Sequence, residues 1–329
     1  MNNTKIYKNA SIALKICIII LAFGYILNEV FLKKDFDKIY LFFIDLLNKH
    51  NGVIFIYVII LMLLNWCIEI FKWRFLIKKI ERISFFQSIV GVFSGITVST
   101  FTPNRIGEYG GRVFVLSPEN RWQGVVLTIV GSISQLVTTV CMGVASFLMF
   151  YPQFNMPDSL EFVLVFIAVL TFFLILTFYF NVSVLLNIIN KISWLNKIVK
   201  YVSVLEAINK KELIAVLFLS VLRHIVFSFQ FYLLLRICEI DIGFMQSFIL
   251  TSIIFLILAV IPTIALSEFG IRGTVSLYIF GIFFKGAQCN IDIINLGVIS
   301  AAFFLWFINL AVPAIIGSFF VLKLKFFKA

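Results

Sequence analysis

Long apolar runs separated by short polar segments dominate the sequence. Six runs are long enough to cross a bilayer, because about 20 helical residues span the roughly 30 Å hydrocarbon core. They lie near residues 10–32, 52–77, 122–150, 159–186, 213–236 and 293–322. Only a helix satisfies its backbone hydrogen bonds within a single span. The pattern therefore predicts an all-α polytopic membrane protein of about six transmembrane helices.

Two further apolar regions are interrupted by polar or helix-breaking residues. The first runs from Ser84 to Leu116 and is broken at residues 102–105; the second runs from Phe244 to Phe284 and is broken at residues 261–263. Each half is short for a full span. We expect two re-entrant helical hairpins, each entering and leaving by the same membrane face. Such breaks persist at membrane depth where protein shields them or they line a wet cavity.

Positive charge marks the expected cytoplasmic face. The chain is 62% hydrophobic and 13% charged, with a net charge of +11. With both hairpins re-entrant, the Lys and Arg residues of 72–82, 187–212 and 323–328 all fall on one side, which the positive-inside rule assigns to the cytoplasm. The exception is segment 33–51, which is expected outside although it holds four lysines. We therefore expect a cytoplasmic-membrane protein with both termini in the cytoplasm, whose positive charge meets anionic lipid headgroups rather than nucleic acid.

The two interrupted regions share a sequence pattern. Gln87-Ser88 precedes Pro103 and a Glu-Tyr-Gly-Gly-Arg run at residues 108–112, while Gln246-Ser247 precedes Pro262 and a Glu-Phe-Gly-Ile-Arg run at residues 268–272. The pattern predicts one integral membrane domain, 1–329, built from inverted repeats over 1–150 and 159–322. Transporters built this way bind their substrate near the midplane, where broken helices of the two halves meet.

The first break also resembles a known family. Residues 102–108 read Thr-Pro-Asn-Arg-Ile-Gly-Glu and are followed by Arg112, which is similar to the TPxRxGE…R signature of the lysylphosphatidylglycerol synthase transmembrane-region family, the flippase-like domain. Pro262 and residues 269–272 are similar to that family's later P…GxxGxRE element, although Gly273 stands where the family often has Glu. The resemblance covers essentially the whole chain. It implies movement of a lipid between leaflets. The sequence ends at Ala329 without the soluble domain that makes the aminoacyl lipid in the synthases, so that activity is not expected.

Charged residues at the breaks are the candidate substrate-binding residues. Buried charge in a bilayer costs several kcal/mol and marks functional candidates by default. The candidates are Arg105, Glu108, Arg112, Arg223, Glu268 and Arg272. The cap and hairpin positions are Thr102, Pro103, Gly107, Gly110, Pro262, Ser267 and Gly270.

The candidate residues support two alternatives. In the first, Thr102 caps a helix that starts at Pro103, Ser267 caps the matching helix, and the two helix starts with the arginines hold a lipid phosphate. In the second, Glu108 with Arg112, and Glu268 with Arg272, are ion pairs four residues apart that only brace the hairpins.

Polar residues inside the long spans are expected to have separate roles. Arg223 either neutralises a phosphate or pairs with Glu69 or Glu108. Glu69 is expected to form a snorkelling pair with Lys72 rather than a site. Gln135 and Asn309 are expected to form interhelical hydrogen bonds.

The favoured function is translocation of a phospholipid or lipid-linked polar headgroup across the cytoplasmic membrane. The sequence holds no phosphate-binding P-loop, no H-E-x-x-H motif and no paired-aspartate metal cluster, so neither an enzyme nor a metal or cofactor is expected. The alternatives are an intramembrane enzyme acting on a lipid phosphate and a non-catalytic partner of a lipid-modifying enzyme or a glycosyltransferase.

Overall fold

The described part of the chain is entirely helical. The computed structural model describes residues 52–154, 158–181, 196–261, 265–285 and 291–321, with a few isolated positions before residue 50. Within that part there is no strand, and five helical stretches are long and apolar enough to cross a membrane. They are Gly52–Ile77, Pro118–Gln153, Phe162–Phe180, Lys210–Ile237 and Ile291–Val321. Five predicted spans are thus confirmed as helices. Apart from those isolated positions, the predicted span 10–32, segment 33–51 and the C-terminal lysines lie outside the described residues.

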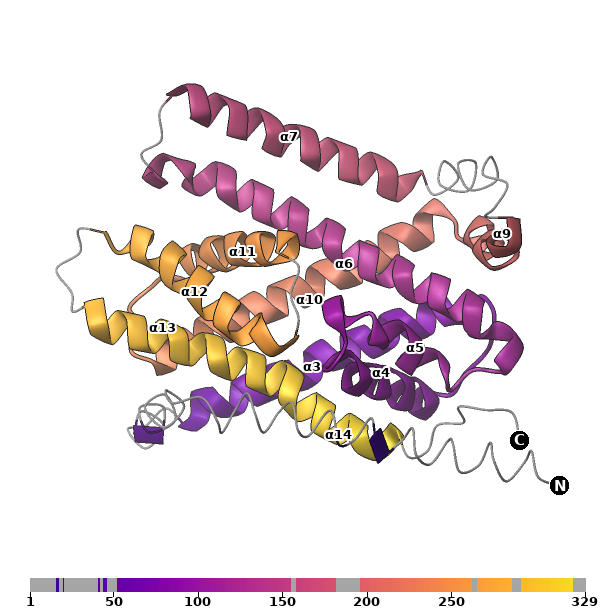
Figure 1. The fold of residues 1–329 in the computed structure, drawn as a ribbon. Helices are drawn as coiled ribbons and strands as arrows, with labels where there is room; N and C mark the ends of the chain where they lie inside the picture. Colours follow the sequence, from indigo (N-terminus) through magenta and orange to yellow (C-terminus); the bar gives the residue numbers. More distant parts are fainter. Residues whose placement is uncertain are drawn as a thin grey trace.

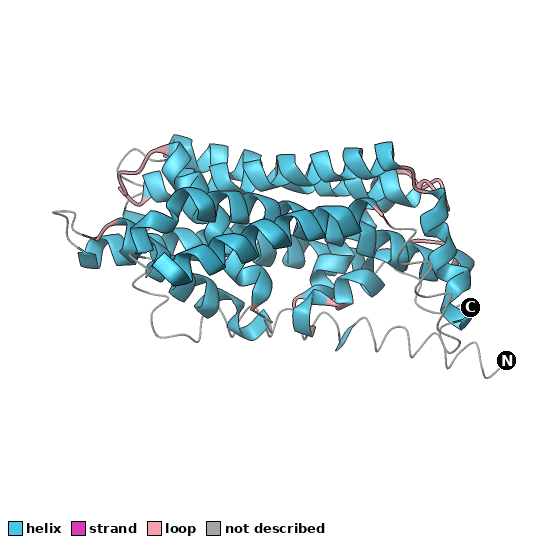
Figure 2. Ribbon diagram, turned by 90° about the horizontal axis from the view of Figure 1, so that it is seen from above, coloured by secondary structure: helices cyan, strands magenta, loops and turns pink. Residues whose placement is uncertain are grey.

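The helices stack into an elongated slab (Figures 1 and 2). Their bounds are α3 Gly52–Ile77, α4 Phe85–Ser99, α5 Gly107–Val113, α6 Arg121–Phe150, α7 Asp158–Phe180, α9 Asn196–Val202, α10 Lys210–Ile237, α11 Phe244–Val260, α12 Ala265–Phe283, α13 Ile291–Trp306 and α14 Val312–Val321. A π-helical turn, Phe307–Ala311, joins α13 to α14. In Figure 1, α6 crosses the molecule with α7 along its outer side, and α11 and α12 lie between α6 and α13.

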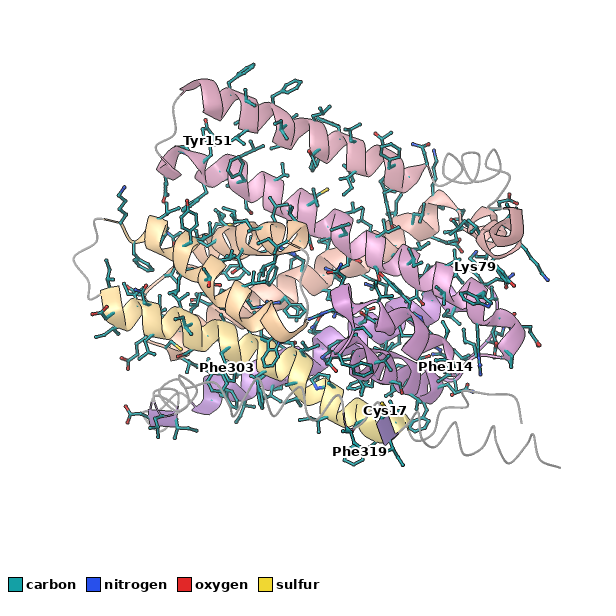
Figure 3. All side chains as sticks on the ribbon, viewed as in Figure 1. Cys17, Lys79, Phe114, Tyr151, Phe303 and Phe319 are labelled. Atoms are coloured by element: carbon teal, nitrogen blue, oxygen red, sulfur yellow. The ribbon has the colours of Figure 1, made fainter. Side chains whose placement is uncertain are left out.

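The outer helices present apolar side chains to the surroundings. Only 6% of the most apolar stretch of α7 is buried, and Phe166 and Phe173 are more than half exposed. Phe319 projects outward from α14 in the same manner (Figure 3). A soluble protein seldom exposes apolar surface on this scale. These faces are suited to contact with lipid acyl chains, as expected for a multi-pass membrane protein.

Each interrupted region forms two helices that pack together. Helix α4 packs against α5, and α11 packs against α12. At the first break the backbone leaves helical geometry at Asn104 and Arg105, whose φ angles are 49° and 56°. This left-handed region is uncommon for residues with a side chain, and asparagine is among those that tolerate it best. The break lies where the sequence predicted it; of the second break, residues 262–264 lie outside the described residues.

The shared Gln-Ser pattern begins the first helix of each pair. The Gln87 Oε1 atom accepts a hydrogen bond from the backbone N–H of Ser84 at 2.8 Å. The Gln246 Oε1 atom accepts the equivalent bond from Gly243 at 2.8 Å. In both cases the glutamine satisfies an N–H group just ahead of the first helical turn, as in a capping box. The two sequence motifs therefore have the same local structural role.

Glycines set the close approach of the helices in the first pair. A Cβ atom on Gly111 would lie 2.7 Å from the Cα atom of Gly95, and one on Gly95 would lie 2.5 Å from the Arg112 Cγ atom. Small residues let helix backbones approach this closely in membrane proteins. The contact between α4 and α5 thereby fixes the position of Arg112.

Neighbouring glycines of α5 provide a matched test of this contact. We expect Gly111→Ala to destabilise the protein by about 1–3 kcal/mol, because the new methyl group overlaps backbone rather than a movable side chain. Gly110→Ala is the control, because a Cβ atom there has nothing within 4 Å. Thermal unfolding in detergent measures both variants. Equal melting temperatures would show that α4 and α5 are not in close contact.

Candidate functional site

Glu69 occupies the centre of a buried charge cluster. It lies on α3, about 12 Å along the helix axis from Ile77, and is only 4% exposed. Its Oε1 atom is 2.7 Å from Arg112 Nη1, and its Oε2 atom is 2.8 Å from Lys72 Nζ and 2.7 Å from Arg223 Nη1. The carboxylate thus joins α3, α5 and α10. The expected snorkelling arrangement is wrong: Glu69 does pair with Lys72, but both side chains are buried.

Arg112 bridges two carboxylates. Its Nη2 atom forms an ion pair with Glu108 one turn earlier on α5, while Nη1 binds Glu69. The predicted pairing of residues 108 and 112 is confirmed. Arg112 therefore braces α5, and it also connects that helix to α3. The alternative in which Glu108 and Arg112 only brace the hairpin therefore describes part of the role of Arg112.

Arg223 also binds Glu69 but is more accessible. Its Nε atom donates to the Asn65 Oδ1 atom at 2.8 Å, and its guanidinium carbon lies 5.2 Å from the ring centre of Trp66. The predicted alternative of a pair with Glu69 is confirmed. The Arg223 side chain is 14% exposed, compared with 5% for Arg112 and 2% for Lys72. Arg223 is thus the cation of the three that most readily meets an incoming ligand.

Amide side chains extend the polar interior beyond the charges. The Asn65 Nδ2 atom donates to the Asn309 Oδ1 atom at 3.3 Å. Asn309 Nδ2 in turn donates to Gln230 Oε1 at 2.8 Å. This chain of hydrogen bonds ends where Gln230 Nε2 donates to the Val58 carbonyl at 2.9 Å. The predicted interhelical bonding of Asn309 is confirmed, and Asn309 lies in the π-helical turn. The interhelical hydrogen bond predicted for Gln135 is not formed by its Oε1 atom. That atom is buried and has no hydrogen-bond partner within the described part of the chain.

The first break differs in detail from its predicted form. Pro103 begins a short 3-10 turn that ends at Arg105, and the helix starts only at Gly107. The predicted cap is therefore wrong: Ile106 is the N-cap of α5 and makes no side-chain cap. Thr102 still stabilises the break, because its Oγ1 atom accepts a hydrogen bond from the Gly107 N–H at 2.9 Å. A Cβ atom on Gly107 would lie 2.7 Å from the Val98 carbonyl oxygen, so a larger residue does not fit. Since α5 has only seven residues, a phosphate at this break would depend on arginine side chains rather than on a helix dipole.

Of the predicted residues at the second break, the structure describes Gly270 and Arg272 on α12. The turn at residues 103–105 contacts α12, and Arg105 lies within electrostatic range of Arg223. Arg272 on α12 places its guanidinium 5.7 Å from the ring centre of Phe255 on α11. Gly270 lies on the exposed side of α12. Pro262 and the side chains of Ser267 and Glu268 lie outside what the structure describes.

The described residues of this site form what we call the central charge cluster: Glu69, Lys72, Glu108, Arg112 and Arg223. Among these five described side chains, three cations meet two carboxylates, which leaves one excess positive charge. Buried charges need partners, and an anion is the complement of such an excess. Within the described residues, no group of His, Cys, Asp and Glu could hold a metal ion.

Sequence reasoning missed the central role of Glu69 and its neighbour Asn65. A signal was present: Asn65 and Glu69 are four residues apart and Lys72 follows three later, so all three share one face of an otherwise apolar span. Arg223 and Gln230, seven residues apart, form a similar polar face on α10. Two polar faces in two apolar spans indicate helices that pack against each other.

Comparison with known proteins gives one family match. The model of the lysylphosphatidylglycerol synthase TM region matches residues 12–289, which include the first break, Glu69, Arg223 and Arg272. Neither the curated proteins nor the solved structures yield a match to this chain.

Proposed function

The chain belongs to the lysylphosphatidylglycerol synthase transmembrane-region family, and from this premise we propose that it is a flippase-like transporter. It moves a phospholipid or a lipid-linked polar headgroup between the leaflets of the cytoplasmic membrane. The central charge cluster supports this proposal, because its excess cation lies inside the membrane-spanning part of the protein. A buried ionisable group at that depth indicates a substrate pathway.

In this proposal, Glu69 holds the place of the substrate phosphate. When no lipid is bound, the carboxylate neutralises Arg223 and Arg112 at 2.7 Å each. An entering phosphate takes over Arg223, which is the more exposed of the two arginines, while Arg112 stays on Glu69 and Glu108. Planar guanidinium groups bind carboxylate and phosphate oxygens in the same way. This exchange of partners lets the headgroup enter without leaving a charge unpaired.

The two interrupted regions act as re-entrant hairpins in inverted repeats, 1–150 and 159–322. The first hairpin opens to the cytoplasm and the second to the exterior, so the headgroup passes between them at the midplane. Two observations support this arrangement: the equivalent caps at Gln87 and Gln246, and the contact between the first break and α12. Alternating exposure of the two halves is the usual mode of inverted-repeat transporters.

Thiol labelling tests the orientation, with both termini proposed to be cytoplasmic. Glu119 and Gln153 are exposed and lie near opposite ends of the span Pro118–Gln153. In a cysteine-free background, a membrane-impermeant maleimide added to intact cells is expected to label Gln153→Cys and to spare Glu119→Cys until the cells are opened. The reverse pattern would overturn the orientation.

Leaflet exchange in liposomes tests the function. Purified protein is reconstituted with a lipid that carries a fluorophore on its headgroup, and a membrane-impermeant quencher then reports the fraction of label in the outer leaflet. Exchange faster than in protein-free liposomes supports the transporter. A chemically altered lipid would instead support an intramembrane enzyme. If neither occurs over a panel of anionic and zwitterionic lipids, a non-catalytic partner of a lipid-modifying enzyme or a glycosyltransferase becomes the better account.

A further inference from the structure

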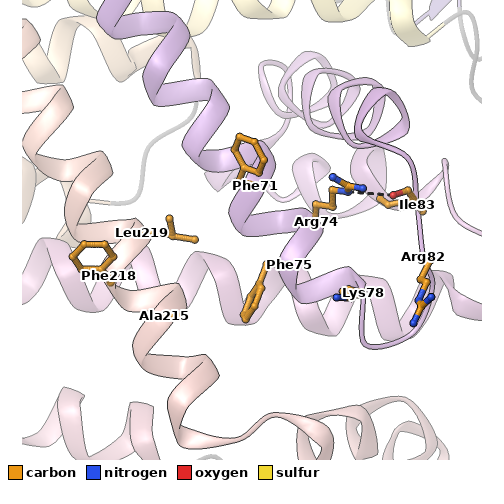
Figure 4. Close-up of a pocket in the computed structure, with 9 residues that line it drawn as sticks. All are labelled: Phe71, Arg74, Phe75, Lys78, Arg82, Ile83, Ala215, Phe218 and Leu219. Atoms are coloured by element: carbon orange, nitrogen blue, oxygen red, sulfur yellow. Dashed lines mark hydrogen bonds between the residues drawn. The ribbon is translucent and has the colours of Figure 1, made fainter.

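A groove separate from the central charge cluster lies between α3 and α10 (Figure 4). It has a volume of about 710 Å³, and we call it the α3–α10 groove. Its apolar wall includes Phe71 and Phe75 from α3 and Phe218 and Leu219 from α10. Phe71 is 52% exposed and Phe218 is 59% exposed. The groove therefore opens on the flank of the molecule, where the surroundings are lipid acyl chains.

Cationic side chains gather at one end of the groove. Arg74, Lys78 and Arg82 line it together with the aromatic residues, and the lining includes no carboxylate among the described residues. Arg74 donates through Nε to the Ile83 carbonyl at 3.2 Å, which leaves its other nitrogens for a ligand. The neighbouring Glu81 is engaged elsewhere, because it accepts bonds from the Ser117 N–H and from Asn120.

The polar and apolar ends of the groove follow each other along the axis of α3, one of the long apolar helices. Phe71 lies on α3 and Lys78 directly follows its last residue, with its N–H still bonded to the Arg74 carbonyl at 3.1 Å. Seven residues of helical rise separate Phe71 from Lys78 by about 10 Å. The end of α3 and the start of α10 lie at the same end of the molecule, since Lys79 Nζ is 2.6 Å from Glu212 Oε1 and donates to the Ala207 carbonyl at 2.8 Å. The cations therefore lie at the level of lipid headgroups, and the aromatic wall lies at the level of the acyl chains. This order matches a phospholipid within one leaflet.

We infer that the α3–α10 groove binds an anionic glycerophospholipid, with its phosphate on Arg74, Lys78 and Arg82 and an acyl chain along Phe71, Phe75 and Phe218. Charge complementarity selects the anionic lipid, and long basic side chains at the membrane surface are suited to that contact. The inference goes beyond the proposed function, because binding here requires no transport.

The α3–α10 groove and the central charge cluster are distinct, but residues of both lie along the same face of α10. Ala215, Leu219 and Arg223 are spaced four residues apart, so they lie along one face of α10. Ala215 and Leu219 line the groove, and Arg223 binds Glu69. A lipid in the groove would thus lie on the helix face that leads to the most exposed cation of the cluster.

Photo-crosslinking in nanodiscs tests the site. The bilayer consists of phosphatidylcholine with a small fraction of either phosphatidylglycerol or phosphatidylcholine that carries a diazirine on one acyl chain. Mass spectrometry is expected to find the label on peptides that contain residues 71–75 and 215–219. We expect phosphatidylglycerol to give about tenfold more label than phosphatidylcholine, and unlabelled phosphatidylglycerol to compete.

Matched charge variants identify the headgroup contact. The double variant Lys78→Gln with Arg82→Gln is expected to lower phosphatidylglycerol labelling about tenfold. The control, Lys210→Gln with Lys211→Gln, removes the same charge from exposed positions of α10 outside the groove lining. It is expected to leave labelling unchanged, and both variants are checked for an unchanged melting temperature.

Several results would overturn the inference: equal labelling by the two lipids, an equal loss in the control variant, or competition by inorganic phosphate alone. If the double variant loses its fold, the comparison of the two lipids on the wild-type chain still tests whether the groove prefers the anionic lipid. Labelling of the groove without leaflet exchange in liposomes would refute the proposed transport and leave this site in place.

Discussion

Replacing Glu69 by glutamine is expected to destabilise the protein by about 3–5 kcal/mol, the usual cost of breaking a buried ion pair from one side. The change leaves Lys72, Arg112 and Arg223 facing Glu108 alone, so the cluster gains one more uncompensated positive charge. A glutamine amide can still accept a hydrogen bond, but it does not neutralise a cation. The melting temperature in detergent and the yield of membrane-inserted protein measure this effect.

Two further variants show whether charge balance is the cause. In Glu69→Gln with Lys72→Met, one cation is removed along with the carboxylate, so the excess returns to a single positive charge. We expect this double variant to recover much of the lost stability. Glu206→Gln is the control, because Glu206 is exposed on a short 3-10 helix and its replacement is expected to change stability by less than about 0.5 kcal/mol. No recovery in the double variant would mean that Glu69 acts through the specific geometry of its bonds rather than through its charge.

Arg223→Gln is expected to have the opposite profile, with lost transport and a retained fold. Removing this cation leaves two positive and two negative side chains in the cluster, which remain paired with one another. The Arg223→Gln cluster, however, lacks the excess positive charge that favours binding of a phosphate. Loss of a charge-assisted hydrogen bond of about 1.5–3 kcal/mol corresponds to a fall in leaflet exchange of roughly tenfold or more. The liposome quenching assay at low lipid-substrate concentration measures this fall.

Arg223→Lys and Arg236→Gln are the controls for this prediction. The lysine keeps the positive charge and is expected to retain more exchange than glutamine, although it lacks the paired donors of a guanidinium. Arg236 lies on the same helix, is 44% exposed in its side chain and pairs with Asp241 at 2.9 Å. Its replacement is expected to leave exchange unchanged. Normal exchange by Arg223→Gln would assign the cluster to the scaffold and would remove the main support for the proposed phosphate site.

Much of the architecture is determined by the sequence alone. Apolar runs of sufficient length must form helices in a bilayer, because an unpaired backbone group in hydrocarbon costs several kcal/mol. For that reason five predicted spans and the position of the first break agree with the structure. The pairing of Glu108 with Arg112 was equally predictable from the sequence, because one helical turn brings residues four apart together.

The centre of the site was decided only by tertiary structure. Glu69 meets Arg112 from 43 residues away, and Asn65 meets Asn309 from 244 residues away. Local spacing shows which face of a helix is polar, but not which other helix that face meets. Packing makes that selection; for Arg112, the close approach of Gly95 to Gly111 holds α5 against α4.

The consequence is clearest at Arg112. Read from sequence, exchanging the charges of residues 108 and 112 would preserve a brace within α5. In the folded protein the Nη1 atom of Arg112 is 2.7 Å from Glu69, so a carboxylate at position 112 would face another carboxylate in a buried, low-dielectric site. The sequence determines the helices and their polar faces, because these depend on neighbours within a turn. The shared use of one carboxylate by three helices depends on how those helices pack, which local spacing does not encode.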